Sequence, residues 1–285
     1  MPISFQNVSY IYNPKTPMEK RALSHINLEI AEGSFTAIVG RTGCGKSTLI
    51  QHLNALINPS EGLVLVDSFH NDANKKKRDK KMKPLRKSVG LVFQFPEYQL
   101  FDETVEKDVA FGPKNFGATK EEALEKAHAA LAEVGLDESF YERSPFELSG
   151  GEKRRVAIAG ILAMEPKYLV VDEPTAGLDP LGARDVMDLF KKVHEAGTTL
   201  ILVTHDMDIV LSYCTDVIVL EHGEVAKVCK PADLFGEEVE RYSLQTPFLY
   251  SFASQLSAKG YDIDAKELRD VSDLAKQIAL RRNKK

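Results

Sequence analysis

A glycine-rich run near the N-terminus carries the residue types best suited to chemistry. It fits the pattern G-x-x-x-x-G-K-[ST] of a phosphate-binding loop, and with one further residue it reads Gly40, Arg41, Thr42, Gly43, Cys44, Gly45, Lys46, Ser47 and Thr48. Its glycines allow positive φ angles, so consecutive backbone N–H groups can point at one phosphate, and Lys46 can reach the β- and γ-phosphates. The Ser47 hydroxyl suits a ligand of Mg²⁺. The loop therefore predicts binding of ATP or GTP together with Mg²⁺.

Two adjacent carboxylates follow a second apolar run. The residues from Tyr168 to Val171 read as a buried parallel strand, and Asp172 and Glu173 come at its C-terminal end. Ligands of open α/β sheets bind at this end of the strands. Both acids are therefore expected at the nucleotide site.

A third motif narrows the class of protein. The residues Leu148, Ser149, Gly150, Gly151 and Glu152 precede a segment that is predicted to be an amphipathic helix. Two glycines at this point leave N–H groups free and present the positive end of the helix to an anion. Placed after the phosphate loop, these residues resemble the signature motif of the ATP-binding cassette (ABC) ATPases. The resemblance implies that they contact the γ-phosphate of ATP held by the phosphate loop of a partner subunit.

The same resemblance implies roles for the acidic residues. Asp172 matches the Walker-B aspartate, which holds Mg²⁺ directly or through water. Glu173 matches the general base, which polarises the attacking water. Asp179 lies in a run that is similar to the D-loop, which links the two ATP sites of the family.

Three further residues complete the implied site. His205 and Gln94 each follow a predicted strand. His205 matches the switch histidine that contacts the γ-phosphate, and Gln94 matches the Q-loop glutamine that senses Mg²⁺ and the attacking water. Tyr12 resembles the aromatic residue that stacks on adenine, although Tyr10 is close enough to take that place.

Composition excludes several other classes of protein. The chain has 285 residues, of which 43% are hydrophobic, and a formal net charge of -5. It can therefore bury a full core, and no overall basicity points to nucleic acid. Its cysteines, Cys44, Cys214 and Cys229, lack metal-ligand spacing and fit a reducing cytosol. Since there is neither a signal peptide nor an apolar run long enough to span a bilayer, the chain is expected to be soluble or peripheral on a membrane.

Cys44 suggests a separate chemical hypothesis. It lies in the phosphate loop at the head of a helix, where a thiolate is favoured. A maleimide is then expected to inactivate the protein, with ATP protecting it. The alternative is that Cys44 is simply a small residue that fits the loop.

The order of the predicted elements indicates an α/β fold. The resemblance implies an ABC-type P-loop ATPase domain at residues 1–230, with a RecA-like parallel sheet core, an N-terminal antiparallel β subdomain and a helical signature subdomain at about 95–165. Strands are predicted at 3–10, 24–30 and 63–67, and a hairpin at 217–228. A capping box, Thr119 with Glu122, begins a helix in the helical part.

The last part of the chain carries no ABC motif. Residues 231–285 predict a small helical extension. On its last helix Val271, Leu274, Ala275 and Ile278 form an apolar stripe, which is typical of core packing or a dimer contact.

The segment after Gln94 indicates what the ATPase drives. In ABC transporters this region is a groove that grips a coupling helix of the membrane subunit, and here it contains Phe95, Pro96, Glu97, Tyr98, Leu100 and Phe101. Together with DVAFGPKN at 108–115, it resembles the ATPases of energy-coupling factor (ECF) transporters, which import vitamins or transition-metal ions. Residues 12–14, 16–17 and 21–23 resemble the second of that family's two paralogous ATPase subunits.

The ECF resemblance implies partners and a location. Two ATPases, this chain and its paralogue, must meet head to tail to complete the ATP sites. They dock, as peripheral proteins at the cytoplasmic face of the cell membrane, on a transmembrane scaffold that carries interchangeable substrate-binding membrane subunits. Glu97, Asp102 and Glu103 are expected to pair with arginines of that scaffold.

Two other functions share the catalytic motifs. A soluble ABC ATPase acting on nucleic acid or the ribosome would carry long coiled-coil insertions or a second cassette, and the sequence has neither. An exporter ATPase differs only in the groove, so FQFPEYQLF at 93–101 argues against it. The basic run from Lys75 to Lys83 has no interleaved aromatic residues, which favours a solvated loop over binding of nucleic acid or anionic lipid. No nucleic-acid partner is expected.

Overall fold

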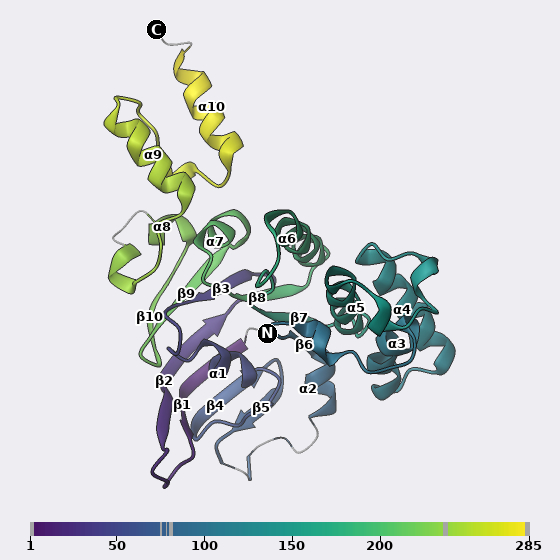
Figure 1. Ribbon diagram of the computed structural model, residues 1–285. Helices are drawn as coiled ribbons and strands as arrows, with labels where there is room; N and C mark the ends of the chain where they lie inside the picture. The colour runs from purple at the N-terminus through teal and green to yellow at the C-terminus, as the bar shows by residue number, and fades with distance from the viewer. Residues whose placement is uncertain (1–2, 75, 78, 80–81, 236–238, 283–285) are drawn as a thin grey trace.

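The fold is organised around a sheet of mainly parallel strands. Within the residues that this computed structural model describes, which are 3–74, 76–77, 79, 82–235 and 239–282, six strands form it in the order β10-β9-β3-β8-β7-β6 (Figure 1). They are β3 (Phe35–Val39), β6 (Val89–Val92), β7 (Tyr168–Asp172), β8 (Thr199–Val203), β9 (Asp216–Glu221) and β10 (Glu224–Cys229). Neighbouring strands are parallel up to β9, which forms the predicted hairpin with β10. The prediction of a parallel α/β core is confirmed.

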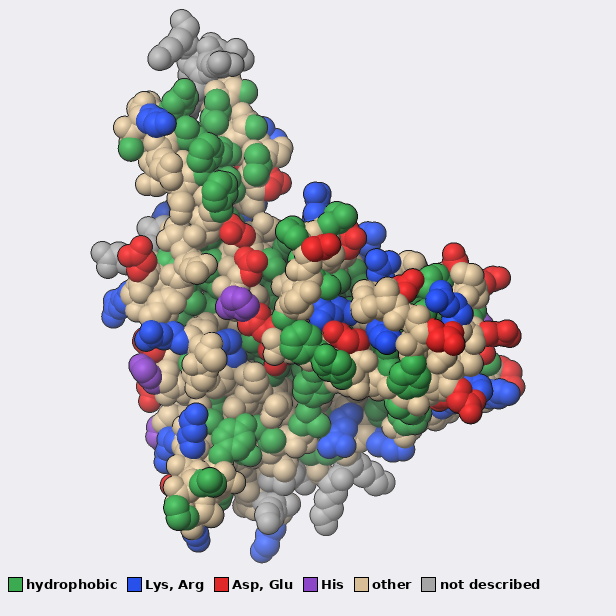
Figure 2. Space-filling view, viewed as in Figure 1, with side chains coloured by type: hydrophobic (Ala, Val, Ile, Leu, Met, Phe, Trp, Pro, Cys, Tyr) green, Lys and Arg blue, Asp and Glu red, His purple; other side chains and the backbone are tan. Residues whose placement is uncertain are grey.

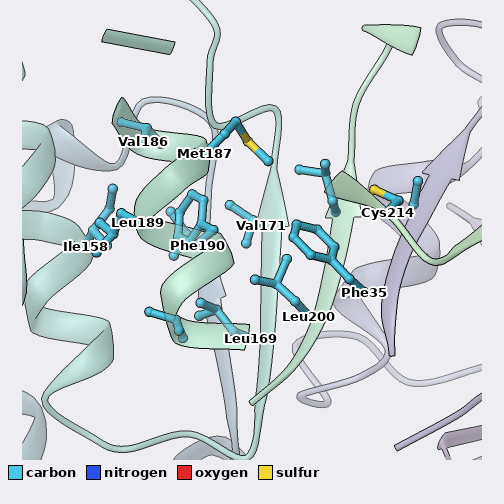
Figure 3. Close-up of a cluster of buried hydrophobic side chains, with 14 of the residues drawn as sticks. Phe35, Ile158, Leu169, Val171, Val186, Met187, Leu189, Phe190, Leu200 and Cys214 are labelled. Atoms are coloured by element: carbon cyan, nitrogen blue, oxygen red, sulfur yellow. The ribbon is translucent and has the colours of Figure 1, made fainter. Parts of the chain in front are cut away.

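The central strands are buried on both faces, so their alternate residues enter two different cores. Leu169 and Leu200 belong to one cluster, which α6 (Pro180–Glu195) covers (Figure 3). Their neighbours Tyr168 and Ile201 belong to the cluster on the other face. A slip of one residue would exchange the two sets, and this double burial therefore fixes the strand register.

The N-terminal part of the chain adds an antiparallel sheet beside the first. In spatial order its strands are β2 (Lys20–Ile30), β1 (Ile3–Tyr12), β4 (Glu61–Val66) and β5 (Phe69–Asp72). The predicted antiparallel subdomain is confirmed, although β1 and β2 are longer than predicted and β5 was not predicted. Leu49 and Ile50 of α1 (Lys46–Gln51) share one buried cluster with side chains from both sheets. The helix after the phosphate loop is thus held between the two sheets.

The basic run leads into α2 (Lys83–Ser88). Lys75, Arg78, Lys80 and Lys81 lie outside the described residues. In the described part of the run, the carboxylate of Asp79 accepts a hydrogen bond from the backbone N–H of His70 at 2.8 Å. This bond ties the run to β5.

Helices between β6 and β7 lie together at one side of the parallel sheet (Figure 1): α3 (Val105–Asn115), α4 (Lys120–Glu133) and α5 (Gly150–Leu162). The capping box predicted at the start of α4 is confirmed, since Thr119 and Glu122 exchange hydrogen bonds of 2.8 and 3.2 Å. The prediction for α5 was wrong in two respects. The helix begins at Gly150, so both glycines lie in its first turn, and none of its residues from Glu152 onward is exposed. It contacts α3, α4 and β6, and this packing on several sides leaves no polar face.

The described residues beyond β10 form helices, as predicted: α8 (Pro231–Phe235), α9 (Phe248–Ala258) and α10 (Val271–Arg282). Only part of the apolar stripe on α10 is buried. Leu274 is buried and Ile278 half-buried, whereas Val271 and Ala275 are exposed. Half of the predicted stripe therefore remains available on the surface.

Helices α9 and α10 project from the end of the molecule (Figure 1). Figure 2 shows hydrophobic side chains gathered over this projection. Phe248 and Phe252 of α9 are exposed, and their rings are stacked with centroids 6.1 Å apart. Within the described part of the chain, no helix combines the length and the apolar character needed to cross a membrane.

A buried histidine follows the last residue of α1. His52 is fully buried, and its Nδ1 lies 2.7 Å from the Thr48 carbonyl oxygen. Because a carbonyl only accepts, Nδ1 carries the proton and donates. Burial lowers the pKa of His52 from its ordinary 6.5 to about 4, so the imidazole is neutral at physiological pH.

This histidine predicts a pH dependence of stability. Unfolded His52 takes up a proton below pH 6.5, but folded His52 does so only near pH 4, so the free energy of unfolding falls as the pH falls through that window. At about 1.36 kcal/mol per pH unit, the wild type should lose about 2 kcal/mol more than His52→Gln between pH 7 and pH 5. Urea denaturation at both pH values measures the difference, and equal losses in the two proteins would contradict it.

Candidate active site

The phosphate loop connects the end of β3 to the start of α1, as predicted. Gly40 and Gly45 have φ angles of 143° and 109°, a region that favours glycine. A Cβ atom would lie 2.2 Å from the Leu220 carbonyl oxygen at position 40 and 2.7 Å from the Ala22 carbonyl oxygen at position 45. Lys46 donates from Nζ to the Gly40 carbonyl at 2.7 Å, which holds its ammonium group against the loop.

A cavity of about 450 Å³ brings together most of the residues that were predicted to bind the nucleotide and Mg²⁺ or to act in catalysis. Those that line it are Tyr12, Thr42, Gly43, Gly45, Lys46, Ser47, Thr48, Gln94, Asp172, Glu173 and His205. Gly40 and Cys44 are instead buried within the loop, and Arg41 is exposed outside the cavity. Lys20 and Ala22 of β2 also line it. The sequence did not indicate these two, because a single basic residue on a strand forms no motif.

Asp172 and Ser47 form the first polar pair of the cavity. The parallel register places Asp172 opposite Val203 of β8, and the Ser47 hydroxyl donates a hydrogen bond to its carboxylate. Burial raises the pKa of Asp172 above its ordinary value, and the hydrogen bond from Ser47 opposes this rise. The amide of Gln94 lines the same cavity. These oxygen donors suit a hard cation such as Mg²⁺.

Glu173 and His205 form the second polar pair. Glu173 Oε2 and His205 Nδ1 are 2.9 Å apart, and the side chains are 16% and 80% exposed. Glu173 has a φ angle of 48°, a left-handed conformation that costs a non-glycine residue about 1 kcal/mol or more. Its N–H is held by the Val203 carbonyl at 2.9 Å. The backbone thus holds a sheltered carboxylate beside an outward-facing histidine, an arrangement that suits a general base with a positioning partner.

Of the two neighbouring tyrosines, Tyr12 faces the cavity. Tyr12 lines it, and its hydroxyl lies 3.1 Å from Thr48 Oγ1. Tyr10 packs behind Tyr12, with ring centroids 4.8 Å apart and planes at 86°. Tyr12 is therefore the ring that a nucleotide base in the cavity would contact.

Arg154 of α5 is a site residue that the sequence did not reveal. Its Nε and Nη2 donate to the two carboxylate oxygens of Glu97 at 3.2 and 3.0 Å. Its Nη1 donates to the carbonyls of Pro174 and Ala176 at 3.3 and 3.0 Å. The arginine side chain is only 5% exposed. It therefore ties α5 to the segment after Gln94 and to the segment after Glu173.

These contacts change the interpretation of the predicted groove. Glu97 is already engaged by Arg154, so it is not the free carboxylate that pairing with a scaffold arginine would need. Pro96 and Leu100 are buried. The exposed members of the set are Phe95, Tyr98 and Phe101, and Phe111 of α3 joins them by an edge-to-face contact with Phe101. We call these four side chains the aromatic surface.

The signature residues lie outside the cavity: Leu148, Ser149, Gly150, Gly151 and Glu152. Around Gly150 and Gly151 there is open space, with no atom within 4 Å of an added Cβ. Asp179 also lies outside the cavity, where its carboxylate caps α6 by accepting from the N–H of Gly182 at 2.7 Å. The cavity at the phosphate loop is therefore lined by none of the signature residues of the same chain.

The structure contradicts the expectation of a reactive thiolate at Cys44. The side chain is only 7% exposed. Burial raises the pKa of the Cys44 thiol, and this effect outweighs the nearby Lys46 ammonium and the backbone hydrogen bonds that lower it. Cys44 is thus a small buried residue that fits the loop.

Sequence comparison gives the chain a family. It matches the ABC transporter family over residues 23–176. It is 51% identical over 281 residues to the energy-coupling factor transporter ATP-binding protein EcfA2 of Enterococcus faecalis, covering 98% of this chain and 96% of that protein. It is 52% identical over 279 residues to the protein of the same name from Spiroplasma kunkelii, covering 97% of this chain and 91% of the relative.

Solved structures agree with this assignment. The chain superposes on cbiO1 from Clostridium perfringens, described as part of the ABC transporter complex cbiONQ, with a TM-score of 0.71, 41% identity and coverage of 84% of this chain and 92% of that one. The chain also superposes on the ATP-binding cassette MJ0796, a dimer bound to ADP and Pi, with a TM-score of 0.70 and 32% identity. This match covers 80% of this chain and 98% of that one. The chain therefore belongs to the ABC transporter family, among the energy-coupling factor transporter ATP-binding proteins.

Proposed function

We propose that this chain is the ATP-hydrolysing subunit of an energy-coupling factor importer for vitamins or transition-metal ions, and that it corresponds to the second of the two paralogous ATPases. The observation that carries the proposal is the meeting of the phosphate loop, Asp172, Glu173 and His205 at one cavity. Nearly full-length similarity to relatives named as ECF transporter ATP-binding proteins supports the assignment to import.

The residues of the cavity have separate roles in ATP hydrolysis. Lys46 and the N–H groups of the loop bind the β- and γ-phosphates of ATP. Ser47, Asp172 and Gln94 would hold Mg²⁺, which supplies positive charge next to the phosphates. Glu173 accepts the proton of the attacking water while His205 holds its carboxylate in place.

The signature residues act on a partner. Their glycines are exposed and lie away from the chain's own phosphate loop, so they would complete the ATP site of a second ATPase, the paralogue, in a head-to-tail dimer. Exposed Phe146 and Leu181, next to the signature and to Asp179, supply apolar area for such an interface. The stacked rings of Phe248 and Phe252 make the extension at 231–285 a second candidate for dimer contact, apart from the ABC domain at 1–230.

The aromatic surface would receive the membrane partner. An exposed apolar patch of this kind marks an interaction site, and here it adjoins Gln94 and the ATP cavity. We assign it to a transmembrane scaffold that carries interchangeable substrate-binding subunits, with this chain peripheral at the cytoplasmic face.

Affinity purification from detergent-solubilised native membranes tests the proposal. Mass spectrometry should identify a second ATPase, a helical membrane scaffold and one or more small membrane proteins. Recovery of the chain from the soluble fraction with ribosomes or nucleic acid would overturn the proposal and favour the soluble ABC ATPases.

A conservative substitution tests the general base. Glu173→Gln keeps the size of the side chain but cannot accept the proton of water, so ATP hydrolysis by the assembled complex should fall about 10²-fold or more while ATP binding is retained. Phosphate release and equilibrium nucleotide binding measure the two effects. The exposed Glu195→Gln serves as the matched control, and near-normal turnover in Glu173→Gln would remove Glu173 from this role.

A second substitution tests the link through Arg154. Glu97→Ala leaves a buried guanidinium without its carboxylate, which should destabilise the chain by about 3 kcal/mol and reduce transport, with nucleotide binding retained because Glu97 lies outside the cavity. Glu195→Ala is the matched control, since Glu195 is 61% exposed and its carboxylate pairs with Lys191 of α6, outside the groove. Thermal unfolding and substrate uptake measure both variants. If the two variants have the same thermal stability and the same rate of uptake, the buried ion pair contributes to neither.

A further inference from the structure

Side chains beside the phosphate loop form a closed set of contacts. The ring of Tyr12 meets that of Tyr10 edge to face, with centroids 4.8 Å apart, and Tyr10 meets His52 in the same way at 5.2 Å. Both ends of this row return to Thr48. The Tyr12 hydroxyl lies 3.1 Å from Thr48 Oγ1, and His52 Nδ1 donates to the Thr48 carbonyl at 2.7 Å. We call these four residues the Tyr12 support.

Two residues of the Tyr12 support line the cavity and two lie outside it. Tyr12 and Thr48 line the cavity, whereas Tyr10 and His52 do not. Tyr12 is the last residue of β1, and residues 13–20, which follow it, are all exposed. The backbone of Tyr12 pairs with Lys20 of β2, while its side chain contacts Tyr10 and Thr48. These two contacts restrain the ring.

The two residues of the support that lie outside the cavity carry no charge at physiological pH. His52 is fully buried and neutral at physiological pH, because burial lowers its pKa to about 4. Its Nε2 has no hydrogen-bond partner among the described residues, so its ring serves Tyr10 as a packing surface. Thr48 belongs to α1, which also carries Lys46 and Ser47. The support thus joins the ring of Tyr12 to the helix that holds the phosphate-binding residues.

We propose that Tyr10 and His52 are positioning residues that hold the Tyr12 ring at a fixed place relative to the phosphate loop, and so determine how strongly the base of ATP adds to the binding of its phosphates. This inference rests on the proposed function, in which Tyr12 stacks on adenine. A ring that is already in place loses less conformational freedom when the base binds. Loss of the support should therefore weaken ATP binding about five-fold and leave the binding of a ligand without a base unchanged.

Competition binding separates the two contributions. ATP and inorganic tripolyphosphate, each with Mg²⁺, displace a fluorescent ribose-modified ATP analogue from the full chain. The Kd of tripolyphosphate divided by the Kd of ATP measures the contribution of the base. We expect Tyr10→Leu to reduce this ratio about five-fold with the Kd of tripolyphosphate unchanged. Tyr10→Phe keeps the ring and should keep the wild-type ratio. His52→Leu removes both the ring contact and the bond to Thr48, and it should resemble Tyr10→Leu.

Tyr12→Ala distinguishes failure of the inference from failure of its premise. If Tyr12→Ala loses the preference for ATP while Tyr10→Leu and His52→Leu keep it, the positioning role is overturned and the stacking role of Tyr12 stands. If the wild type binds tripolyphosphate as tightly as ATP, or if Tyr12→Ala keeps the preference, stacking on Tyr12 itself is overturned. Should His52→Leu fail to fold, the comparison of Tyr10→Leu with Tyr10→Phe still decides the question.

Discussion

The common direction of β3, β8, β7 and β6 is the constraint on which the rest of the structure depends. Because these strands are parallel, their carboxyl ends lie at one edge of the sheet. The end of each strand, or the loop that follows it, delivers a group to that edge: the phosphate loop, His205, the pair Asp172 and Glu173, and Gln94. The register is held by apolar side chains buried on both faces. A polar site is therefore positioned by hydrophobic packing.

Arg154 connects this edge of the sheet to the surfaces that are proposed to contact partners. Its buried guanidinium joins the carboxylate of Glu97 to the backbone carbonyls of Pro174 and Ala176. A buried charge that keeps all its partners restrains them strongly, since removing any one of them is costly. The start of the signature helix, the aromatic surface and the segment after Glu173 are consequently tied to one side chain. The ATP site and the proposed membrane contact thus share a physical connection inside one chain.

Burial also decides the chemistry of several ionisable groups. At Cys44 the head of a helix favours the thiolate, but the loss of solvent is the larger effect and raises the pKa. At Asp172 the same loss of solvent raises the pKa, and the Ser47 hydroxyl and the Lys46 ammonium oppose it. At His52 burial keeps the ring neutral. In each case the outcome depends on neighbours that are distant in sequence or on the depth of the site.

Sequence alone determined the chemistry-bearing motifs and the class of fold. The phosphate loop, the acidic pair after β7 and the histidine after β8 are local patterns, and double burial makes the strands continuous apolar runs, so both are readable along the chain. The sequence could not decide whether Tyr10 or Tyr12 faces the nucleotide. It also could not identify Arg154 and Lys20 as residues of the site, or show that Glu97 is already paired. Those facts depend on contacts between side chains, and the two partners can be far apart in the sequence, as Glu97 and Arg154 are. Only tertiary packing, which sets contact and burial, decided them.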